Sequence, residues 1–338
     1  MTFVYQPTAE LPPPLRFSNA ECLRLFSEGV QQLQRYSVSA DSLALNLALE
    51  RFSKCTQRFP SDILPRFYLG VAKTLTSYDG ADEAIDHFRA VESAGTPSLR
   101  LIAAYNRAIA LIAKYSGPAF EEAEHILVGV LATVRALRNA RDDSSELVEA
   151  DLHSLYCQAV AKLQFIRVRQ KLWAARETLT VESHEPIATE LRGELAKFQE
   201  ELTETPPAVA ADDIWAYHHN NVGLLDESCA YLYRATDPRK SRDYAERSLR
   251  QYQMALAKKN GWPNAMANLA RVEYEFLDKK DEAIAILEQL AQGLQQAQYA
   301  HLLLGRAYLD RGDKERARQH LEQAPKIPEA VSLLKSLD

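Results

Sequence analysis

Residues 304–324, LGRAYLDRGDKERARQHLEQA, alternate small and large apolar residues at helical spacing on both sides of a turn at Gly312. Apolar residues three or four positions apart lie on one face of a helix. A small residue in each of two antiparallel helices lets their backbones approach closely. The stretch therefore predicts a helical hairpin. Its small and apolar positions are Leu304, Gly305, Tyr308, Ala317, Leu321 and Ala324.

The same spacing recurs along the chain. The small residue of the second helix repeats in steps of about 34 to 39 residues, with one gap in the middle. A single helix pair leaves an apolar face exposed, so pairs of this kind stack on one another. We expect the small residues of the two helices to meet and the bulky residues to fill the groove towards the next pair. The recurring small positions are Ala48, Ala84, Ala123, Ser248, Ala283 and Ala317.

This pattern resembles the tetratricopeptide repeat family, in which a Leu-Gly pair and a Tyr mark the first helix. Ala48, Phe52, Cys55 and Pro60, followed by Leu69-Gly70, fit the family's second helix, its terminating Pro and its next first helix. The resemblance implies an all-α fold, an α-solenoid of stacked antiparallel helix pairs forming a right-handed superhelix. It also implies a concave surface, lined by the first helices, that holds an extended peptide or a helix of a partner.

Five segments are predicted. Residues 1–39 form an extended segment and a capping helix, and residues 40–141 and 212–324 form two repeat blocks. Residues 142–211 show no repeat phase and are predicted as a helical insertion. Residues 325–338 form a C-terminal capping helix. Within the insertion we expect a long arm-like hairpin, in which one helix runs from about residue 142 to 179 and the other from about 185 to 201.

The long helix of the insertion carries a basic strip. It has no Asp or Glu from Leu152 to Arg176. The favoured interpretation is a solvated stripe that pairs with acidic residues of the next helix, such as Glu190, Glu194, Glu200 and Glu201. The alternative is a surface that docks an acidic partner or a nucleic-acid backbone. The basic residues are Lys162, Arg167, Arg169, Lys171 and Arg176.

The two repeat blocks offer different grooves. In the C-terminal block the groove is polar: Asn side chains can donate to and accept from a peptide main chain, and Arg271 and Arg306 can hold a carboxylate. The Lys and Asn residues of chaperone-binding repeats are not all present, so a chaperone tail is not expected. The predicted groove residues are Asn220, Asn264, Asn268, Arg271, Tyr274 and Arg306.

In the N-terminal block the same face is apolar. It would bind an amphipathic helix or a second copy of the chain, or it is covered by a helix within residues 17–36. Internal cover is slightly favoured. The apolar positions are Phe67, Val71, Leu75, Tyr105, Ile109 and Ile112.

Composition limits the functions and the cellular location that we expect for the protein. The chain has 338 residues, 46% of them hydrophobic, and a formal net charge of -6, which argues against nonspecific nucleic-acid binding by the whole surface. The four cysteines are expected to be buried, reduced thiols. No signal peptide or membrane-length apolar run is visible, so we expect a cytoplasmic protein. The cysteines are Cys22, Cys55, Cys157 and Cys229.

No catalytic constellation is found: there is no glycine-rich phosphate loop, no Gly-x-Ser-x-Gly elbow and no His-Glu-x-x-His motif. His218-His219 are adjacent on a helix and make a poor metal pair. We therefore expect no catalytic residue, cofactor, metal or small-molecule substrate, and no membrane. The favoured function is a non-catalytic scaffold or adaptor that binds a peptide or helix of another protein. The alternative is a nucleic-acid-associated or nucleic-acid-regulated repeat protein that uses residues 162–176. The oligomeric state is not predicted.

Overall fold

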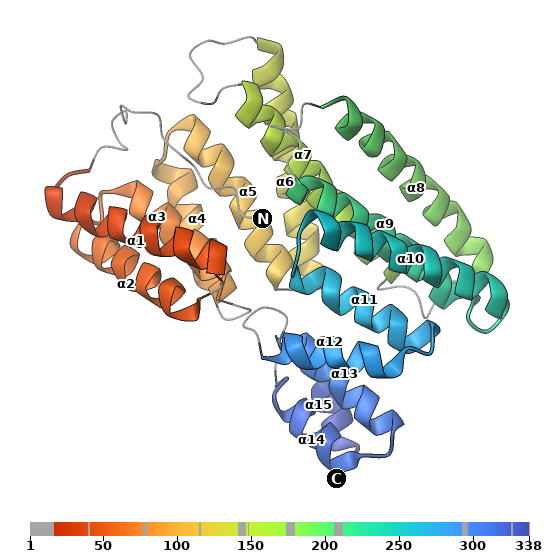
Figure 1. Ribbon diagram of the computed structural model, residues 1–338. Helices are drawn as coiled ribbons and strands as arrows, with labels where there is room; N and C mark the ends of the chain where they lie inside the picture. Colours follow the sequence, from red (N-terminus) through yellow and green to blue (C-terminus); the bar gives the residue numbers. More distant parts are fainter. Residues whose placement is uncertain are drawn as a thin grey trace. The chain divides into compact units, whose positions relative to one another are not determined.

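The computed structural model describes residues 17–39, 41–76, 80–114, 116–140, 147, 149–173, 180–205, 212–292, 297–325 and 327–337. Every regular element among these residues is a helix, which confirms the predicted fold class (Figure 1). The chain divides between Ile166 and Arg167 into two compact units, and each is described separately.

Consecutive helices of the first unit pack as three pairs, α1 with α2, α3 with α4, and α5 with α6. The unit contains α1 (Ala20–Ser39), α2 (Ser42–Arg58), α3 (Ile63–Thr74), α4 (Gly80–Ala94), α5 (Pro97–Ala113), α6 (Gly117–Ala140) and most of α7 (Glu149–Val168). The helix of residues 17–36 is therefore the first helix of a full pair, whereas the sequence suggested a cap.

Helix α7 belongs to the core of the first unit. The hydroxyl of Tyr105 on α5 donates to Gln158 Oε1 at 3.4 Å, and the Phe120 and Phe165 rings lie 6.3 Å apart. Residues of α7 up to Ile166 also join the apolar core of this unit. The segment predicted as a separate insertion is thus divided between the two units. The start of its first helix, at residues 142–146, lies outside the described residues.

The predicted apolar groove of the first unit is mostly interior. Phe67, Val71 and Tyr105 are at most 1% exposed, whereas the remaining positions are half-buried against the same core. The Tyr105 contact shows that α7 contributes to this cover. Helix α1, which we expected to provide it, packs chiefly against α2.

The second unit begins with the π-helix η1 (Arg169–Trp173) and α8 (Val181–Glu204), both of which contact α9. Three pairs follow, α9 with α10, α11 with α12, and α13 with α14, and α15 packs on the last pair. Their bounds are α9 (Asp212–Tyr233), α10 (Pro238–Lys258), α11 (Pro263–Phe276), α12 (Lys280–Ala291), α13 (Ala297–Asp310), α14 (Lys314–Glu322) and α15 (Pro328–Lys335). None of the described helices combines the length and the apolar character needed to cross a lipid bilayer.

A glycine of the first helix contacts a bulky residue of the second helix in four pairs. A Cβ added at Gly70 would lie 2.9 Å from the Phe88 ring, which is closer than a Cβ can approach. The corresponding distance is 2.6 Å in each of the other three pairs. We expected small residues to meet small residues, but the glycine instead makes room for the larger partner. The other pairs are Gly29–Phe52, Gly223–Tyr252 and Gly305–Leu321.

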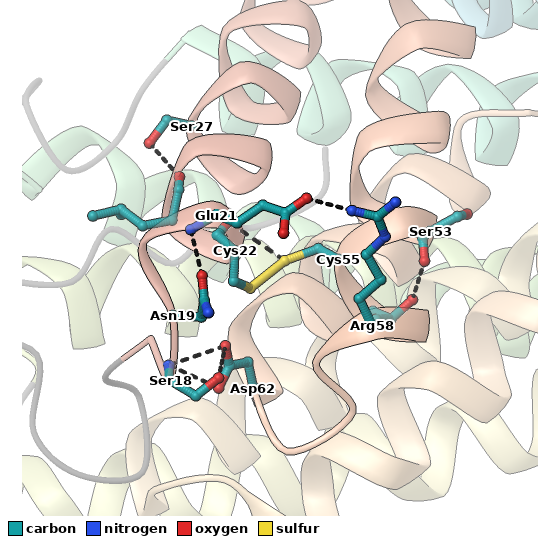
Figure 2. The surroundings of a disulfide bond; sticks show 11 residues. Ser18, Asn19, Glu21, Cys22, Ser27, Ser53, Cys55, Arg58 and Asp62 are labelled. Carbon is teal, nitrogen blue, oxygen red and sulfur yellow. Dashed lines mark hydrogen bonds and ion pairs between the residues drawn. A yellow bond between two sulfur atoms is a disulfide. The ribbon is translucent and has the colours of Figure 1, made fainter.

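The beginning of α1 is bonded to the end of α2 (Figure 2). Cys22 and Cys55 form a disulfide with a Cα–Cα distance of 5.5 Å, and both are fully buried. The prediction of reduced thiols is wrong for this pair, because periodicity placed both residues on buried faces but did not show that the faces meet. Cys157 and Cys229 are buried and are not part of a disulfide in the described part of the chain, as predicted.

Two polar contacts hold the same end of the unit. The backbone N–H and the hydroxyl of Ser18 donate to the carboxylate of Asp62, with distances of 3.0 to 3.2 Å. Glu21 and Arg58 form an ion pair beside the disulfide (Figure 2). The start of α1 is thus fixed to both ends of the turn between α2 and α3.

Candidate binding groove of the C-terminal repeats

The first helices of the second unit are linked by polar side chains. Asn268 on α11 donates from Nδ2 to Asn220 Oδ1 on α9 at 3.0 Å. Its Oδ1 accepts a hydrogen bond from Arg271 Nη2 at 3.1 Å. Three residues predicted for the groove are therefore brought together, but they bind one another. Because both ends of the Asn268 amide are occupied, this side chain orders the groove and is not free to clamp a peptide.

Arg271 is held by a carboxylate of the protein itself. Its Nε and Nη2 donate to the two oxygens of Glu227 at 2.5 and 2.7 Å, and the side chains are 2% and 0% exposed. Tyr252 donates to the same carboxylate at 2.6 Å, and Arg271 Nη1 contacts the hydroxyl of Tyr299. Burial disfavours the charged guanidinium, but Glu227 outweighs it and holds the pKa of Arg271 above its usual value. The expectation that Arg271 takes a ligand's carboxylate is therefore wrong.

A pocket of about 170 Å³ opens beside this network. Tyr274 and Arg306, both half-buried, form part of its wall, and Leu287 and Leu303 give it an apolar side. Burial, followed by a hydrogen bond to Asp310 Oδ2 at 2.9 Å, raises the pKa of Tyr274 to about 12, so this hydroxyl stays protonated as a donor. The lining residues are Arg234, Arg271, Tyr274, Glu275, Lys280, Leu287, Leu303, Arg306 and Asp310.

Unlike Arg271, the other arginines of the pocket, Arg234 and Arg306, are only loosely paired. Arg306 lies 3.8 Å from Glu275 and 3.5 Å from Glu329, and its side chain is 41% exposed. Arg234 lies 3.6 Å from Glu275. These separations exceed those of good hydrogen bonds, so the guanidinium groups retain donors for another acceptor. Lys280 is exposed, with its ammonium 5.7 Å from the centre of the Tyr274 ring.

Of the six predicted groove residues, Arg271, Tyr274 and Arg306 line the pocket, whereas Asn220, Asn264 and Asn268 do not. Sequence reasoning missed Glu227 and Glu275. A signal was present for Glu227, because Asp226 and Glu227 lie between apolar residues of α9 and a buried carboxylate needs a cation.

Residues 277–337, which contain α12 to α15, match a family model for the tetratricopeptide repeat. Residues 277–337 carry the tetratricopeptide repeat. A tetratricopeptide repeat protein from Parabacteroides merdae ATCC 43184 is 12% identical, with 94% of this chain and 98% of that chain covered and a TM-score of 0.47. The tetratricopeptide repeat domain of P58(IPK) is 14% identical, with coverage of 94% and 97% and a TM-score of 0.29. Yeast Tom70 is 11% identical, with coverage of 94% and 95% and a TM-score of 0.24. No curated protein was found to match the sequence.

The basic strip that precedes the helix pairs of the second unit is largely paired. Arg167 contacts Glu194 at 3.1 Å, and Lys171 lies 3.6 Å from Glu190 on α8. The favoured interpretation, pairing with acidic residues of the next helix, is confirmed for these two cations.

The remaining cations of the strip do not form an open surface. Lys162 and Arg169 are 7% and 9% exposed, and Arg176 lies outside the described residues. A phosphate backbone needs accessible, unpaired cations. The described part of the strip provides few of them.

His218 is buried in an aromatic cluster at the start of the repeats. It is 1% exposed, and neither ring nitrogen has a hydrogen-bond partner among the described residues. The rings of Phe198 and Trp215 lie 5.9 and 6.0 Å from it. Burial, followed by the neighbouring His219, lowers the pKa of His218 to about 4. His219 is turned to Gln251, with a distance of 2.9 Å from Nδ1 to Oε1.

We expect the second unit to lose stability as the pH falls from 6.5 towards 4. In this window the unfolded chain takes up a proton on His218 and the folded chain does not, so the free energy of unfolding decreases. The slope is about 1.4 kcal/mol per pH unit, giving about 2–3 kcal/mol in all. Urea unfolding at several pH values measures this loss of stability. Burial raises the pKa of Asp226, and that group therefore acts in the opposite direction. The pH dependence of the unaltered protein is therefore compared with that of the His218→Phe variant, in which only the histidine is missing. An unchanged pH slope in this variant contradicts the assignment.

Proposed function

We propose that this chain is a non-catalytic scaffold that binds a segment of another protein along α9, α11 and α13. The observation that carries the proposal is the pocket between α11 and α13, which combines an apolar wall with loosely paired cations. Three of its residues were predicted for peptide binding from the sequence. A pocket of this size holds one or two side chains of an extended segment and not a whole helix.

The buried network supports the proposal, because it fixes the first helices before any ligand arrives. Glu227, Arg271 and Asn268 connect α9 to α11, and Tyr299 extends the network to α13. A preformed groove avoids the entropy loss of ordering side chains during binding. The exposed donors of Arg306 and Lys280 would then meet carboxylate or carbonyl oxygens of the bound segment.

The test separates groove residues from residues that hold the fold. Tyr274→Ala combined with Arg306→Ala should weaken partner binding by about 30-fold or more, since residues central to an interface often contribute 2 kcal/mol. Partners are cross-linked and affinity-purified from the native host, identified by mass spectrometry, and retested as pure proteins. The control is Arg242→Ala, which removes an exposed arginine from α10.

Equal binding by the double variant and the control variant, with unchanged circular dichroism, would exclude the groove. The nucleic-acid alternative has less support, because the described cations of residues 162–176 are buried or paired. Salt-sensitive retention on RNA that is lost in Arg167→Glu with Lys171→Glu would favour it instead.

A further inference from the structure

Two histidines of the last repeat face each other outside the groove. His301 on α13 and His320 on α14 place their Nδ1 atoms 3.0 Å apart, and their ring centres lie 5.2 Å apart. Both side chains are half-buried. Neither residue lines the pocket, and neither takes part in the network of Arg271.

The two Nδ1 atoms share one hydrogen bond, so one of them carries a proton and the other carries a lone pair. The Nδ1 atom with the lone pair can coordinate a metal ion directly, because its ring is protonated at Nε2. The other ring supplies the proton of the shared hydrogen bond and can present a lone pair at Nδ1 in its second neutral tautomer.

We propose that His301 and His320 together bind one divalent first-row transition-metal ion, such as Zn²⁺, through their Nδ1 atoms. Zinc–nitrogen distances are about 2.0–2.1 Å, so two nitrogens at 90° to 109° around one ion lie about 2.9–3.4 Å apart. The observed 3.0 Å falls within this range. Imidazole is a favourable ligand for zinc, nickel and copper, whereas magnesium and calcium prefer oxygen.

Neighbouring side chains pack against the His320 ring, and two of them carry opposite charges. The Tyr308 ring stacks on it at 5.4 Å with an interplanar angle of 1°, and its hydroxyl donates to Glu288 at 3.0 Å. Glu288 favours a nearby cation, whereas Arg316, which lies over the Tyr308 ring, disfavours one. These two charges offset each other, so the affinity depends on the imidazoles.

The site is open. No group of three or more His, Cys, Asp or Glu side chains that could hold a metal occurs in the described part of the chain, so water completes the coordination. On binding, the donating Nδ1 loses its proton and Nε2 of the same ring gains one, so no net proton is released at neutral pH. Below the pKa range of histidine, protonation competes with the ion and weakens binding. The ion links α13 to α14 and thereby stabilises the last repeat.

Isothermal titration of the full chain with ZnCl₂ at pH 7.5 tests the proposal. We expect saturable binding of one ion that is lost in His301→Ala and in His320→Ala. His125→Ala removes an exposed histidine from the first unit and should bind as the unaltered protein does. MgCl₂ should give no heat of binding. Absence of saturable zinc binding by the unaltered protein, or binding by the two site variants that equals that of the unaltered protein, would overturn the proposal.

A second measurement does not depend on the folding of the variants. Long-range ¹H–¹⁵N spectra of the unaltered protein report each imidazole nitrogen directly. Zinc should shift the Nδ1 signals of His301 and His320 and leave that of His125 in place. Shifts at other histidines alone would assign the ion to a different site and also overturn the proposal.

Discussion

Arg271→Ala should lower the free energy of unfolding of the second unit by about 3–5 kcal/mol, because it leaves Glu227 as an uncompensated buried charge. The Glu227 side chain is 0% exposed and cannot reach water without unfolding its surroundings. All three tryptophans, Trp173, Trp215 and Trp262, belong to the second unit, so tryptophan fluorescence during urea unfolding reports on that unit alone.

A double variant separates loss of a charge pair from loss of packing. Glu227→Leu with Arg271→Met removes both charges at similar volume and should recover much of the stability. Arg306→Ala, at a half-buried arginine of the same groove with ion-pair distances of 3.5 and 3.8 Å, should cost less than about 1 kcal/mol. A loss in Arg271→Ala as small as that of Arg306→Ala would show that the network is not desolvated.

Reduction of the Cys22–Cys55 disulfide should lower the free energy of unfolding of the first unit by about 3–4 kcal/mol. The two cysteines are 33 residues apart, and the bond restricts a loop of that length in the unfolded chain. Unfolding followed by far-ultraviolet circular dichroism, with and without reductant, measures the change. The tryptophan transition should stay in place, because the second unit contains only the free Cys229.

Two controls accompany this experiment. Cys22→Ser with Cys55→Ser should be as unstable as the reduced protein and should no longer respond to reductant. A thiol reagent added to the denatured, unreduced protein should label two of the four cysteines. Labelling of all four would show that the bond is not formed, and an unaltered transition on reduction would show that it does not contribute.

Periodicity was sufficient to predict the helices and most of the stacking. Periodicity failed where many residues separate the glycine from its bulky partner. Gly305 was found because its hairpin is short, whereas Gly29 and Gly223 were missed because α1, α9 and α10 are long helices. The contact between glycine and bulky partner is the same in all of them, but a search at fixed spacing does not detect it.

Prediction of the groove residues met the same limit. Helical spacing placed Arg271 and Tyr274 on one face of α11, and both line the pocket, since a face depends only on the local repeat. The partner of Arg271 is Glu227, 44 residues earlier, and it was not predicted. Which carboxylate meets which guanidinium depends on how the helices stack. For the same reason, Cys22 and Cys55 were predicted to be buried but not to be bonded.

The contact between Gly70 and Phe88, and its counterparts, has a consequence for how such a chain can change in evolution. A side chain gained at the glycine collides with the ring unless the ring is replaced by a smaller residue. The two positions should therefore covary among homologues. The glycine and its bulky partner are separated by different numbers of residues in the four pairs, so loops and helix ends can change in length while this contact is kept.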